Sequence, residues 1–377
     1  MEKRVALIVP MLAPYRVTFY EKLFKDPDKE FCLFHGTKNQ EDGRPQYTQN
    51  VFFKNMQYNF RSFTIGPFEL YYHSSLNKKV KKFNPEIIVM YGNPGVISNI
   101  LLMKWAKRRK IKVILWVCSW DSGNIHGFYK KFKTVISQYY FSQADSFIAY
   151  GTNAKRFLTN FGIGEEKIHI AFNGIETDSM LNNQLKIMNE AKTVRLKYAK
   201  SNDLVFTYVG GLIEPKKILQ LIDQFNIINQ KYLNTKLWII GDGTLRNIVQ
   251  LKLEKLRNEN IKYFGRIIDD VDIYFVASDC LVLPGAGGLA LNQAMFWMKP
   301  CICSVADGTE EDLIFEGITG FYFKRNNWID LQDAMERFIK TTAIKRREMG
   351  EKGHDLIINQ SNVNYMVEIF KKAVNNA

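Results

Sequence analysis

PGAGGLALNQAMFWMKPCICSVADGTEEDLIFEGITGFYF, residues 284–323, is the stretch of this chain that decides its fold. The apolar run CLVL (280–283) leads into it and predicts a buried strand, followed by a glycine-rich turn and a helix that starts near Leu289. A Lys-Pro pair ends the helix, and CICSV predicts the next strand. Glycines let the backbone approach a ligand, and a helix start presents unpaired N–H groups. The segment therefore predicts an anion-binding site at Gly285, Gly287, Gly288 and Leu289.

A second strand–turn–helix segment lies upstream. VFTYVGGLIEPKKILQLI (205–222) predicts a strand that ends at Gly210 and Gly211, a turn through Lys216, and a helix. One glycine turn after a strand is typical of any α/β protein. Several in succession favour a ligand site.

The chain continues in the same pattern. KLWIIGDGTLRNIVQLKLEKL (236–256) predicts a strand, a turn at Gly241 and Asp242, and a helix capped by Thr244. IKYFGRI (261–267) predicts another short strand, which ends in Gly265 and Arg266.

In this order the segments resemble family 4 of the retaining glycosyltransferases. Members of that family show a VGR-L-x(3)-KG turn, a GDGPL turn, a strand ending F-L-G, a P-S-x(2)-EGFGL-x(3)-EAM segment, a GG-x(2)-E loop and a G-x-T-GF strand. The resemblance covers residues 205–323. It implies an α/β protein of the GT-B fold, with two Rossmann-like domains whose parallel sheets face each other across a cleft. It also implies that the chain moves a sugar from a nucleotide diphospho-sugar to a hydroxyl, with retention of the anomeric configuration.

Several positions depart from the family pattern. The arginine of the first turn is Gly211 here, whereas its lysine is kept as Lys216. The two glutamates of the family fall on Gly285 and Gln293, and the acid of the next loop falls on Asp312. In the family the first glutamate touches the donor sugar and the second holds the ribose. An amide at 293 can still hydrogen-bond a ribose hydroxyl, whereas a glycine at 285 cannot replace a carboxylate.

The resemblance also implies roles for charged residues. Lys216 supplies the positive charge on the donor diphosphate, helped by Arg16 or Arg266, and the backbone beside Arg266 lies next to the nucleobase. The departing diphosphate takes the acceptor proton, so no enzyme nucleophile is needed. The resemblance implies no aspartate-x-aspartate metal clamp, which belongs to the other glycosyltransferase fold, and the five histidines of the sequence have no paired spacing. We therefore expect neither a metal nor a cofactor.

The length of 377 residues fits two domains. We expect an N-terminal acceptor-binding domain over 1–175 and a C-terminal nucleotide-sugar-binding domain over 176–360, which begins with a linker (176–202). A final helix over 361–377 crosses back onto the first domain in this fold, although the sequence alone does not show that.

The N-terminus has no signal pattern, no apolar run is long enough to span a bilayer, and the five cysteines include no CxxC pair. These features are typical of a cytoplasmic protein.

Charge is unevenly distributed along the chain. Residues 1–175 hold 26 Lys and Arg against 13 Asp and Glu, whereas the rest hold 26 against 25. The excess lies in LNKKVKKF (76–83), KWAKRRKIK (104–112) and FYKKFK (128–133), each interleaved with apolar residues. This pattern favours peripheral contact with an anionic membrane, or an acidic or lipid-linked acceptor. The alternative is a set of solvated helix faces. No nucleic-acid-binding motif accompanies the charge.

Alternating strands and helices run through the N-terminal half, from VALIVP (5–10) to KIHIAFNG (167–174), with a long loop and an edge strand or two over 36–70. Loops that follow strands supply the candidate acceptor residues. Arg16 either holds a phosphate or carboxylate or is a surface arginine. Asp121 either orients an acceptor hydroxyl or is a turn residue.

Three functions remain open at this stage. The first is a glycosyltransferase acting on a saccharide or lipid-linked acceptor. The second is a non-catalytic GT-B scaffold or regulator of a partner transferase, which the missing arginine and glutamates would suit. The third is a nucleotide-sugar epimerase on the same fold.

Overall fold

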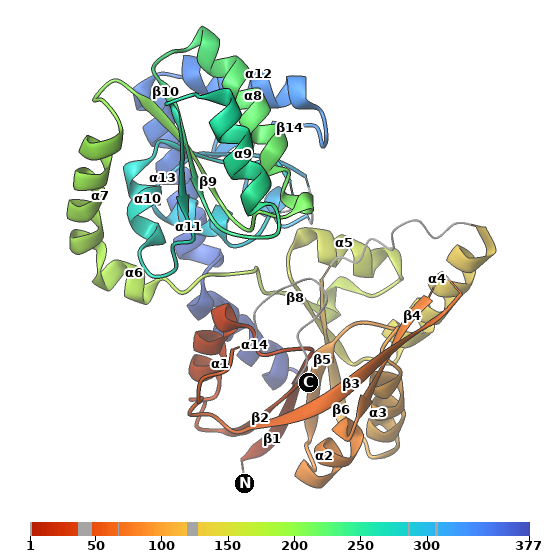
Figure 1. The fold of residues 1–377 in the computed structure, drawn as a ribbon. Helices are drawn as coiled ribbons and strands as arrows, with labels where there is room; N and C mark the ends of the chain where they lie inside the picture. The colour runs from red at the N-terminus through yellow and green to blue at the C-terminus, as the bar shows by residue number, and fades with distance from the viewer. Residues whose placement is uncertain (1, 37–46, 67, 119–126, 286, 306–307) are drawn as a thin grey trace. The chain divides into compact units, whose positions relative to one another are not determined.

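The computed structural model describes residues 2–36, 47–66, 68–118, 127–285, 287–305 and 308–377 (Figure 1). Its contacts divide the chain into two compact units. Unit 1 comprises Met1–Glu176 with Val363–Ala377, and unit 2 comprises Thr177–Asn362. The two predicted domain boundaries, after residues 175 and 360, lie within two residues of these division points.

Unit 1 is built on an eight-stranded sheet in the order β4-β3-β2-β1-β5-β6-β7-β8. All neighbours are parallel except the β3–β4 pair at the edge, which is antiparallel. The strands are β1 (Lys3–Val9), β2 (Lys29–Gly36), β3 (Asn55–Ile65), β4 (Phe68–Ser74), β5 (Ile87–Tyr91), β6 (Lys112–Val117), β7 (Ser146–Ala149) and β8 (Ile168–Ile170).

Helices cover both faces of this sheet. Successive residues of β1 point to opposite faces, and both sets are buried, as in a parallel sheet with helices on each side. The core on one face includes residues of α1 (Val17–Leu23) and α14 (Val363–Asn375). The core on the other includes residues of α2 (Leu76–Phe83), α3 (Ile97–Arg108), α4 (Gly127–Ser142) and α5 (Thr152–Asn160).

The C-terminal helix α14 belongs to the core of unit 1. Phe370 on α14 packs edge-on against Trp116 of β6 and Phe19 of α1, with ring centroids 4.7 and 4.8 Å apart. Such edge-to-face pairs add to the gain from burying the rings. The last residues of the chain thus fold with the first 176.

Unit 2 contains a six-stranded parallel sheet in the order β11-β10-β9-β12-β13-β14. Its strands are β9 (Leu204–Val209), β10 (Thr235–Ile240), β11 (Ile261–Gly265), β12 (Cys280–Leu283), β13 (Cys301–Ser304) and β14 (Gly320–Phe323). Its helices are α6 (Asp178–Asn182), α7 (Gln184–Tyr198), α8 (Ile218–Lys231), α9 (Arg246–Leu256), α10 (Val271–Ala277), α11 (Ala290–Phe296), α12 (Trp328–Lys340) and α13 (Ala343–Gln360). The alternation of strand and helix gives the doubly wound arrangement of a Rossmann-like unit.

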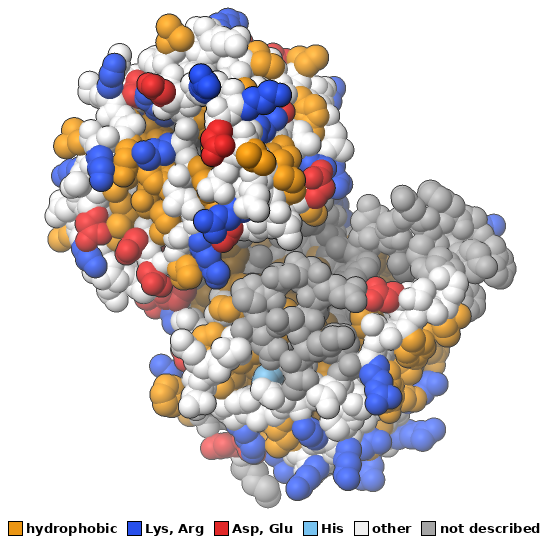
Figure 2. Space-filling view, in the orientation of Figure 1, with side chains coloured by type: hydrophobic (Ala, Val, Ile, Leu, Met, Phe, Trp, Pro, Cys, Tyr) orange, Lys and Arg blue, Asp and Glu red, His pale blue; other side chains and the backbone are white. Residues whose placement is uncertain are grey.

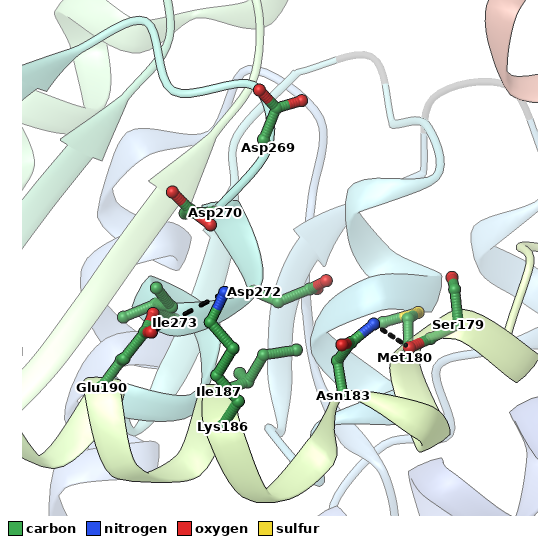
Figure 3. A pocket seen from close by; sticks show the side chains of 10 residues that line it. All are labelled: Ser179, Met180, Asn183, Lys186, Ile187, Glu190, Asp269, Asp270, Asp272 and Ile273. Carbon is green, nitrogen blue, oxygen red and sulfur yellow. Dashed lines mark hydrogen bonds and ion pairs between the residues drawn. The ribbon is translucent and has the colours of Figure 1, made fainter.

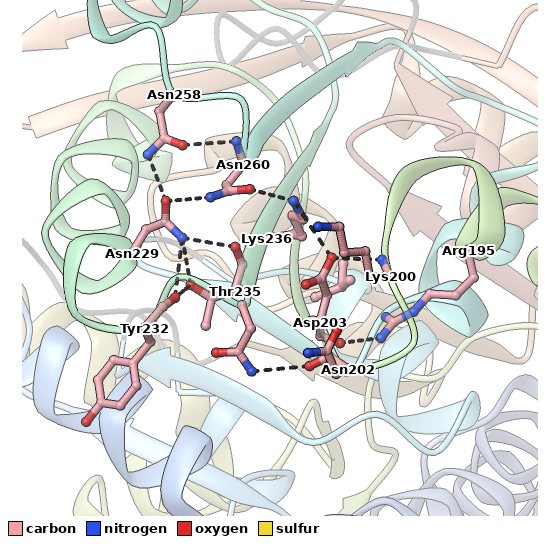
Figure 4. Close-up of polar contacts among 12 residues, drawn as sticks. Arg195, Lys200, Asn202, Asp203, Asn229, Tyr232, Thr235, Lys236, Asn258 and Asn260 are labelled. Atoms are coloured by element: carbon pink, nitrogen blue, oxygen red, sulfur yellow. Dashed lines mark hydrogen bonds and ion pairs between the residues drawn. The ribbon is translucent and has the colours of Figure 1, made fainter.

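A network of amide side chains joins α8 to the amino ends of β10 and β11 (Figure 4). Asn229 on α8 donates to the carbonyl of Thr235 at 3.1 Å, and its own amide oxygen accepts from Asn258 and Asn260 at 3.1 and 3.0 Å. Asn229 is buried, so these hydrogen bonds offset the cost of removing its amide from water. The network fixes the sheet at the end opposite its glycine turns.

Two local predictions were wrong. Thr244 does not cap α9, because the helix begins at Arg246, and its N-cap, Leu245, makes no side-chain hydrogen bond. The Leu245 N–H instead donates to the carbonyl of Leu212 at 2.8 Å, which ties this loop to the neighbouring turn. The strand predicted over 167–174 is only Ile168–Ile170, since the chain then leaves the sheet. Helices α10, α12 and α13 were not predicted.

Candidate functional site

The sheet order of unit 2 places β10, β9, β12 and β13 side by side, so the turns at their carboxyl ends are neighbours. The first contact joins the turns after β9 and β10. A Cβ on Gly241 would lie 1.8 Å from the carbonyl oxygen of Gly210, and one on Gly243 would lie 2.5 Å from that of Leu212. Both distances exclude any side chain. The glycines predicted at 210, 211 and 241 therefore lie together.

The second contact joins the turn after β9 to the one after β12. A Cβ on Gly285 would lie 2.1 Å from the carbonyl oxygen of Pro215. The ammonium of Lys216 donates a hydrogen bond to the carbonyl oxygen of Gly287, and its Nζ would lie 3.7 Å from a Cβ on Gly288. Lys216 thus forms one cluster with Gly285, Gly287 and Gly288, which follow it in the sequence by 69, 71 and 72 residues. We call this arrangement of Gly210–Lys216, Gly241–Gly243, Gly285, Gly287 and Gly288 the glycine site.

A buried carboxylate supports the glycine site from the segment after β13. Glu310 is fully buried, and its Oε2 accepts a hydrogen bond from the N–H of Gly308 at 2.9 Å. Its Oε1 would lie 2.7 Å from a Cβ on Gly287. An ammonium and a carboxylate therefore approach Gly287. Sequence reasoning selected Asp312 in this segment and missed Glu310, whose contact with Gly287 is not visible in any local pattern.

Two tyrosines that the sequence analysis also missed hold backbone carbonyls of the glycine site. Tyr208 on β9 donates to the carbonyl of Gly211 at 2.8 Å, and Tyr263 on β11 donates to that of Gly241 at 3.1 Å. Burial raises the pKa of both phenols, so each stays a neutral donor at neutral pH. The sequence did hold a signal for these tyrosines, because each lies two positions before a glycine at the end of its strand, Gly210 and Gly265.

The carboxylate of Asp242 makes its hydrogen bond and its ion pair within its own turn and helix, whereas its backbone carbonyl contacts the neighbouring turn. Its Oδ1 accepts from the N–H of Gly243 at 2.9 Å, and its Oδ2 lies 3.7 Å from a guanidinium nitrogen of Arg246. Its backbone carbonyl accepts from the N–H of Leu212 at 2.9 Å. These contacts fix the shape of the Gly241–Gly243 turn.

The remaining predicted donor residues lie on α11 and after β11. The helix begins at Ala290 with Leu289 as its N-cap, and the N–H of Leu291 already donates to the carbonyl of Gly288 at 3.2 Å. Gln293 is half-buried one turn into this helix. Arg266 is exposed directly after Gly265, whose φ of +76° is a conformation that favours glycine.

Arg16 lies in unit 1, and the alternative of a surface arginine was wrong. Only 3% of it is exposed. Its guanidinium donates to Asn173, to the hydroxyl of Tyr150 at 3.4 Å and to the sulfur of Met366 at 3.0 Å. It therefore links the end of β1 to the segment after β8 and to α14. Asp121 lies outside the described residues.

A separate pocket of about 240 Å³ in unit 2 is bordered by α6, α7 and α10 (Figure 3). Lys186, Glu190 and Asp270 are among its lining residues, and none of the predicted site residues lines it. Asp272 in this pocket accepts from the indole of Trp297 at 2.7 Å, and burial raises the pKa of its carboxyl. Among the described residues, His, Cys, Asp and Glu form no group of three or more that would hold a metal ion.

The chain has two α/β units whose sheets are built mainly of parallel strands, and the second unit has adjoining glycine turns at its strand ends. This is the fold class of the GT-B glycosyltransferases. Residues 35–179 match the model described as Glycosyltransferase Family 4, and residues 191–355 match the one described as Glycosyl transferases group 1. The chain therefore contains both a Glycosyltransferase Family 4 domain and a Glycosyl transferases group 1 domain.

The individual relatives share less than 30% of their residues with this chain over the matched segments. An uncharacterised glycosyltransferase of Methanocaldococcus jannaschii is 28% identical over 211 residues, covering 54% of this chain and 51% of the relative. CapM of Staphylococcus aureus, a capsular polysaccharide biosynthesis glycosyltransferase, is 26% identical over 172 residues, 44% of each chain. The chain thus spans about half the length of these relatives. The crystal structure of Anabaena Alr3699/HepE in complex with UDP superposes with a TM-score of 0.74 at 12% identity, with 100% of both chains covered, and shows the shared fold.

Proposed function

We propose that this protein transfers a sugar from a nucleotide diphospho-sugar to a hydroxyl of a saccharide or lipid-linked acceptor, with retention, in the synthesis of a surface polysaccharide or glycan. The contact between Lys216 and Gly287 carries the proposal, because it brings an ammonium to glycine turns at the carboxyl ends of neighbouring parallel strands, where sheets of this kind bind ligands. The similarity to CapM, whose name refers to capsular polysaccharide, supports the biological setting.

In this mechanism the glycine site binds the donor diphosphate. Negative charge builds on the diphosphate as the bond to the sugar breaks, and the ammonium of Lys216 stabilises that charge. To do so, it exchanges the carbonyl of Gly287 for a phosphate oxygen. At Gly288 a Cβ would meet only the ammonium of Lys216, so the absence of a side chain leaves room there for phosphate oxygens to reach the backbone. Gln293 holds a ribose hydroxyl, and the backbone beside Arg266 contacts the base.

The reaction needs no group from the enzyme that attacks the sugar. The diphosphate takes the proton of the acceptor hydroxyl on the face from which it departs, so the protein contributes positioning and charge stabilisation. We propose that this proceeds without a metal or a cofactor, and that unit 1 binds the acceptor. Treatment with EDTA should leave the rate of transfer unchanged.

We also propose that the protein works as a peripheral protein at the cytoplasmic side of an anionic membrane. The basic excess of residues 1–175 supports this. Figure 2 shows Lys and Arg side chains gathered over the part of unit 1 that holds α2 and α3. In the described residues, no helix is long and apolar enough to span a bilayer.

The test is a panel of UDP-, GDP- and ADP-sugars screened for thermal stabilisation, followed by a transfer assay with the nucleotide that binds. A ligand at 100 times its Kd stabilises a folded protein by about 2.7 kcal/mol, so even a weak donor registers at millimolar concentration. We expect one nucleotide class to raise the melting temperature and to support transfer to an acceptor. No stabilisation by any of them would overturn the proposal.

A second candidate is a non-catalytic scaffold or regulator of a partner transferase. The residues that favour it are Gly211, Gly285 and Gln293, which stand where the family has an arginine and two glutamates. A scaffold would bind its partner without consuming a nucleotide-sugar. Acceptor-dependent release of nucleotide separates the two functions.

A further inference from the structure

The outer side of α3 and α4 in unit 1 is free of acidic residues. Between Ile87 and Ala144 the sequence holds nine Lys and Arg and one acid, Asp121, which lies on neither helix. Since α3 and α4 cover the same face of the sheet, the charge of both helices acts on one side of unit 1. That side is strongly positive.

Apolar side chains are exposed on the same two helices. On α4, Val135 is 64% exposed and Tyr139 is 58% exposed, and the spacing of four residues places them on one side of the helix. On α3, Leu101 is 46% exposed. Single exposed apolar residues are common on protein surfaces, but a group of them within a basic surface marks an interaction site.

A groove of about 280 Å³ opens between the two helices and joins the basic and the apolar residues. Lys104, Lys107 and Arg108 of α3 line it, as do Ile136 and Tyr139 of α4. Lys107 also donates to the side chain of Gln143 at 2.7 Å, which connects the two helices across the groove. The cations thus lie beside aliphatic and aromatic side chains.

We propose that this α3–α4 surface docks on an anionic phospholipid bilayer. Lys104, Lys107 and Arg108 contact headgroup phosphates, while Val135 and Tyr139 enter the boundary between headgroups and acyl chains, where amphipathic rings such as tyrosine are enriched. The inference rests on the proposed membrane contact and assigns the surface that makes it. It does not depend on which sugar is transferred.

The combination of charge and exposed aliphatic groups favours lipid over other anionic partners. A nucleic acid would be held by cations and by aromatic rings available for stacking, and would gain little from Val135 or Leu101. An acidic protein would need a complementary shape. A fluid lipid surface takes basic and apolar side chains together and needs no fixed shape.

The experiment is sedimentation of the whole protein with phosphatidylcholine vesicles, with and without phosphatidylglycerol, over a range of salt. Two variants test the surface. The charge variant is Lys104→Gln/Lys107→Gln/Arg108→Gln, and the apolar variant is Val135→Ser/Tyr139→Ser. Two matched controls on unit 2 change exposed residues of the same kinds. They are Lys192→Gln/Lys200→Gln/Lys255→Gln and Leu185→Ser/Leu196→Ser, the leucines being 80% and 83% exposed.

We expect wild type to bind vesicles that contain phosphatidylglycerol and to be released as salt rises. Each Lys or Arg near an anionic surface contributes about fivefold to binding, so the charge variant should bind about 100-fold less. The apolar variant should be released at lower salt than wild type, and both controls should behave as wild type. Far-ultraviolet circular dichroism confirms that each variant is folded.

Three results would contradict the inference in distinguishable ways. Equal binding of wild type to neutral and anionic vesicles would overturn the membrane contact itself. Normal binding by both α3–α4 variants would place the contact elsewhere on the protein. The third result is release of the apolar variant at the same salt concentration as wild type, while wild type binds heparin as tightly as it binds vesicles. That pair of observations would assign the surface to a soluble acidic partner. None of these results depends on sugar transfer, which the nucleotide assay tests independently.

Discussion

The ammonium of Lys216 donates a hydrogen bond to the carbonyl oxygen of Gly287, although 71 residues separate the two in the sequence. The contact joins the turn after β9 to the turn after β12, which are adjacent strands in the sheet. The carbonyl is a neutral acceptor. The ammonium can exchange it for a phosphate oxygen, to which a charged donor binds more strongly.

Gln293→Ala should weaken nucleotide binding by about 1 kcal/mol, typical of one neutral hydrogen bond. The side chain is half-buried on α11 at the position that resembles the ribose contact of the family. Titration of the free nucleotide by calorimetry measures the effect. An unchanged affinity would show that the ribose is held elsewhere and that α11 does not correspond to the segment that holds the ribose in the family.

Gly287→Ala should destabilise the protein by about 1–3 kcal/mol, because the new methyl group would lie 2.7 Å from the carboxylate of Glu310 and force a shift. Glu310→Ala should destabilise as well, since it leaves the buried N–H of Gly308 without its acceptor. In the double variant the clash is absent, so the two losses should not add.

Denaturant unfolding of the two single variants and the double variant measures this coupling. Glu310→Gln serves as the control, because it keeps an acceptor oxygen for Gly308 and should lose less stability than Glu310→Ala. Strictly additive losses in the free energy of unfolding would mean that the residues at positions 287 and 310 do not interact.

Lys299 should make stability depend on pH in the alkaline range. Burial lowers the pKa of its ammonium to about 8, while nearby Asp279 opposes the shift and Arg195 adds to it. Between that value and the ordinary pKa of 10.5, the unfolded chain binds more protons than the folded one, so stability rises with pH. The slope is at most about 1.4 kcal/mol per pH unit.

Comparison of wild type with Lys299→Met between pH 7 and 9.5 isolates this effect, because buried tyrosines titrate above that range. The free energy of unfolding of wild type should increase relative to that of Lys299→Met as pH rises. Parallel curves for the two proteins would show that the ammonium of Lys299 is solvated.

Local patterns in the sequence were sufficient for most of the fold and for the backbone of the site. Gly241 and Gly285 were identified because a turn that packs against a neighbouring carbonyl excludes any side chain, and that requirement leaves glycines in the sequence. Lys216 was identified because the resemblance places the lysine of the family's first turn there. Apolar runs were sufficient for the central parallel strands, since both faces of the sheets are covered there.

The missed features depend on contacts between distant segments. Glu310 has no local signature, because its role arises from its approach to Gly287 in the next turn. Arg16 looked equally compatible with the surface and with a site, and only the packing of Tyr150 and Met366 around it shows that it is buried. Thr244 had the right chemistry for a helix cap, but the contact of Leu245 with Leu212 moved the start of α9.

The most direct test of the proposed chemistry is the turnover of Lys216→Ala in a sugar-transfer assay with the nucleotide-sugar that binds. The ammonium interacts most strongly with the diphosphate as negative charge develops, and Gly211 supplies no charge at the position where the family has an arginine. Lys217→Ala is the matched control, since Lys217 pairs with Glu214 at 3.0 Å on the same turn. We predict that Lys216→Ala folds normally and turns over about 10²–10³-fold more slowly, the scale of one lost electrostatic stabiliser, with a smaller change in donor affinity. A folded Lys216→Ala protein with turnover close to that of wild type and of Lys217→Ala would contradict the account.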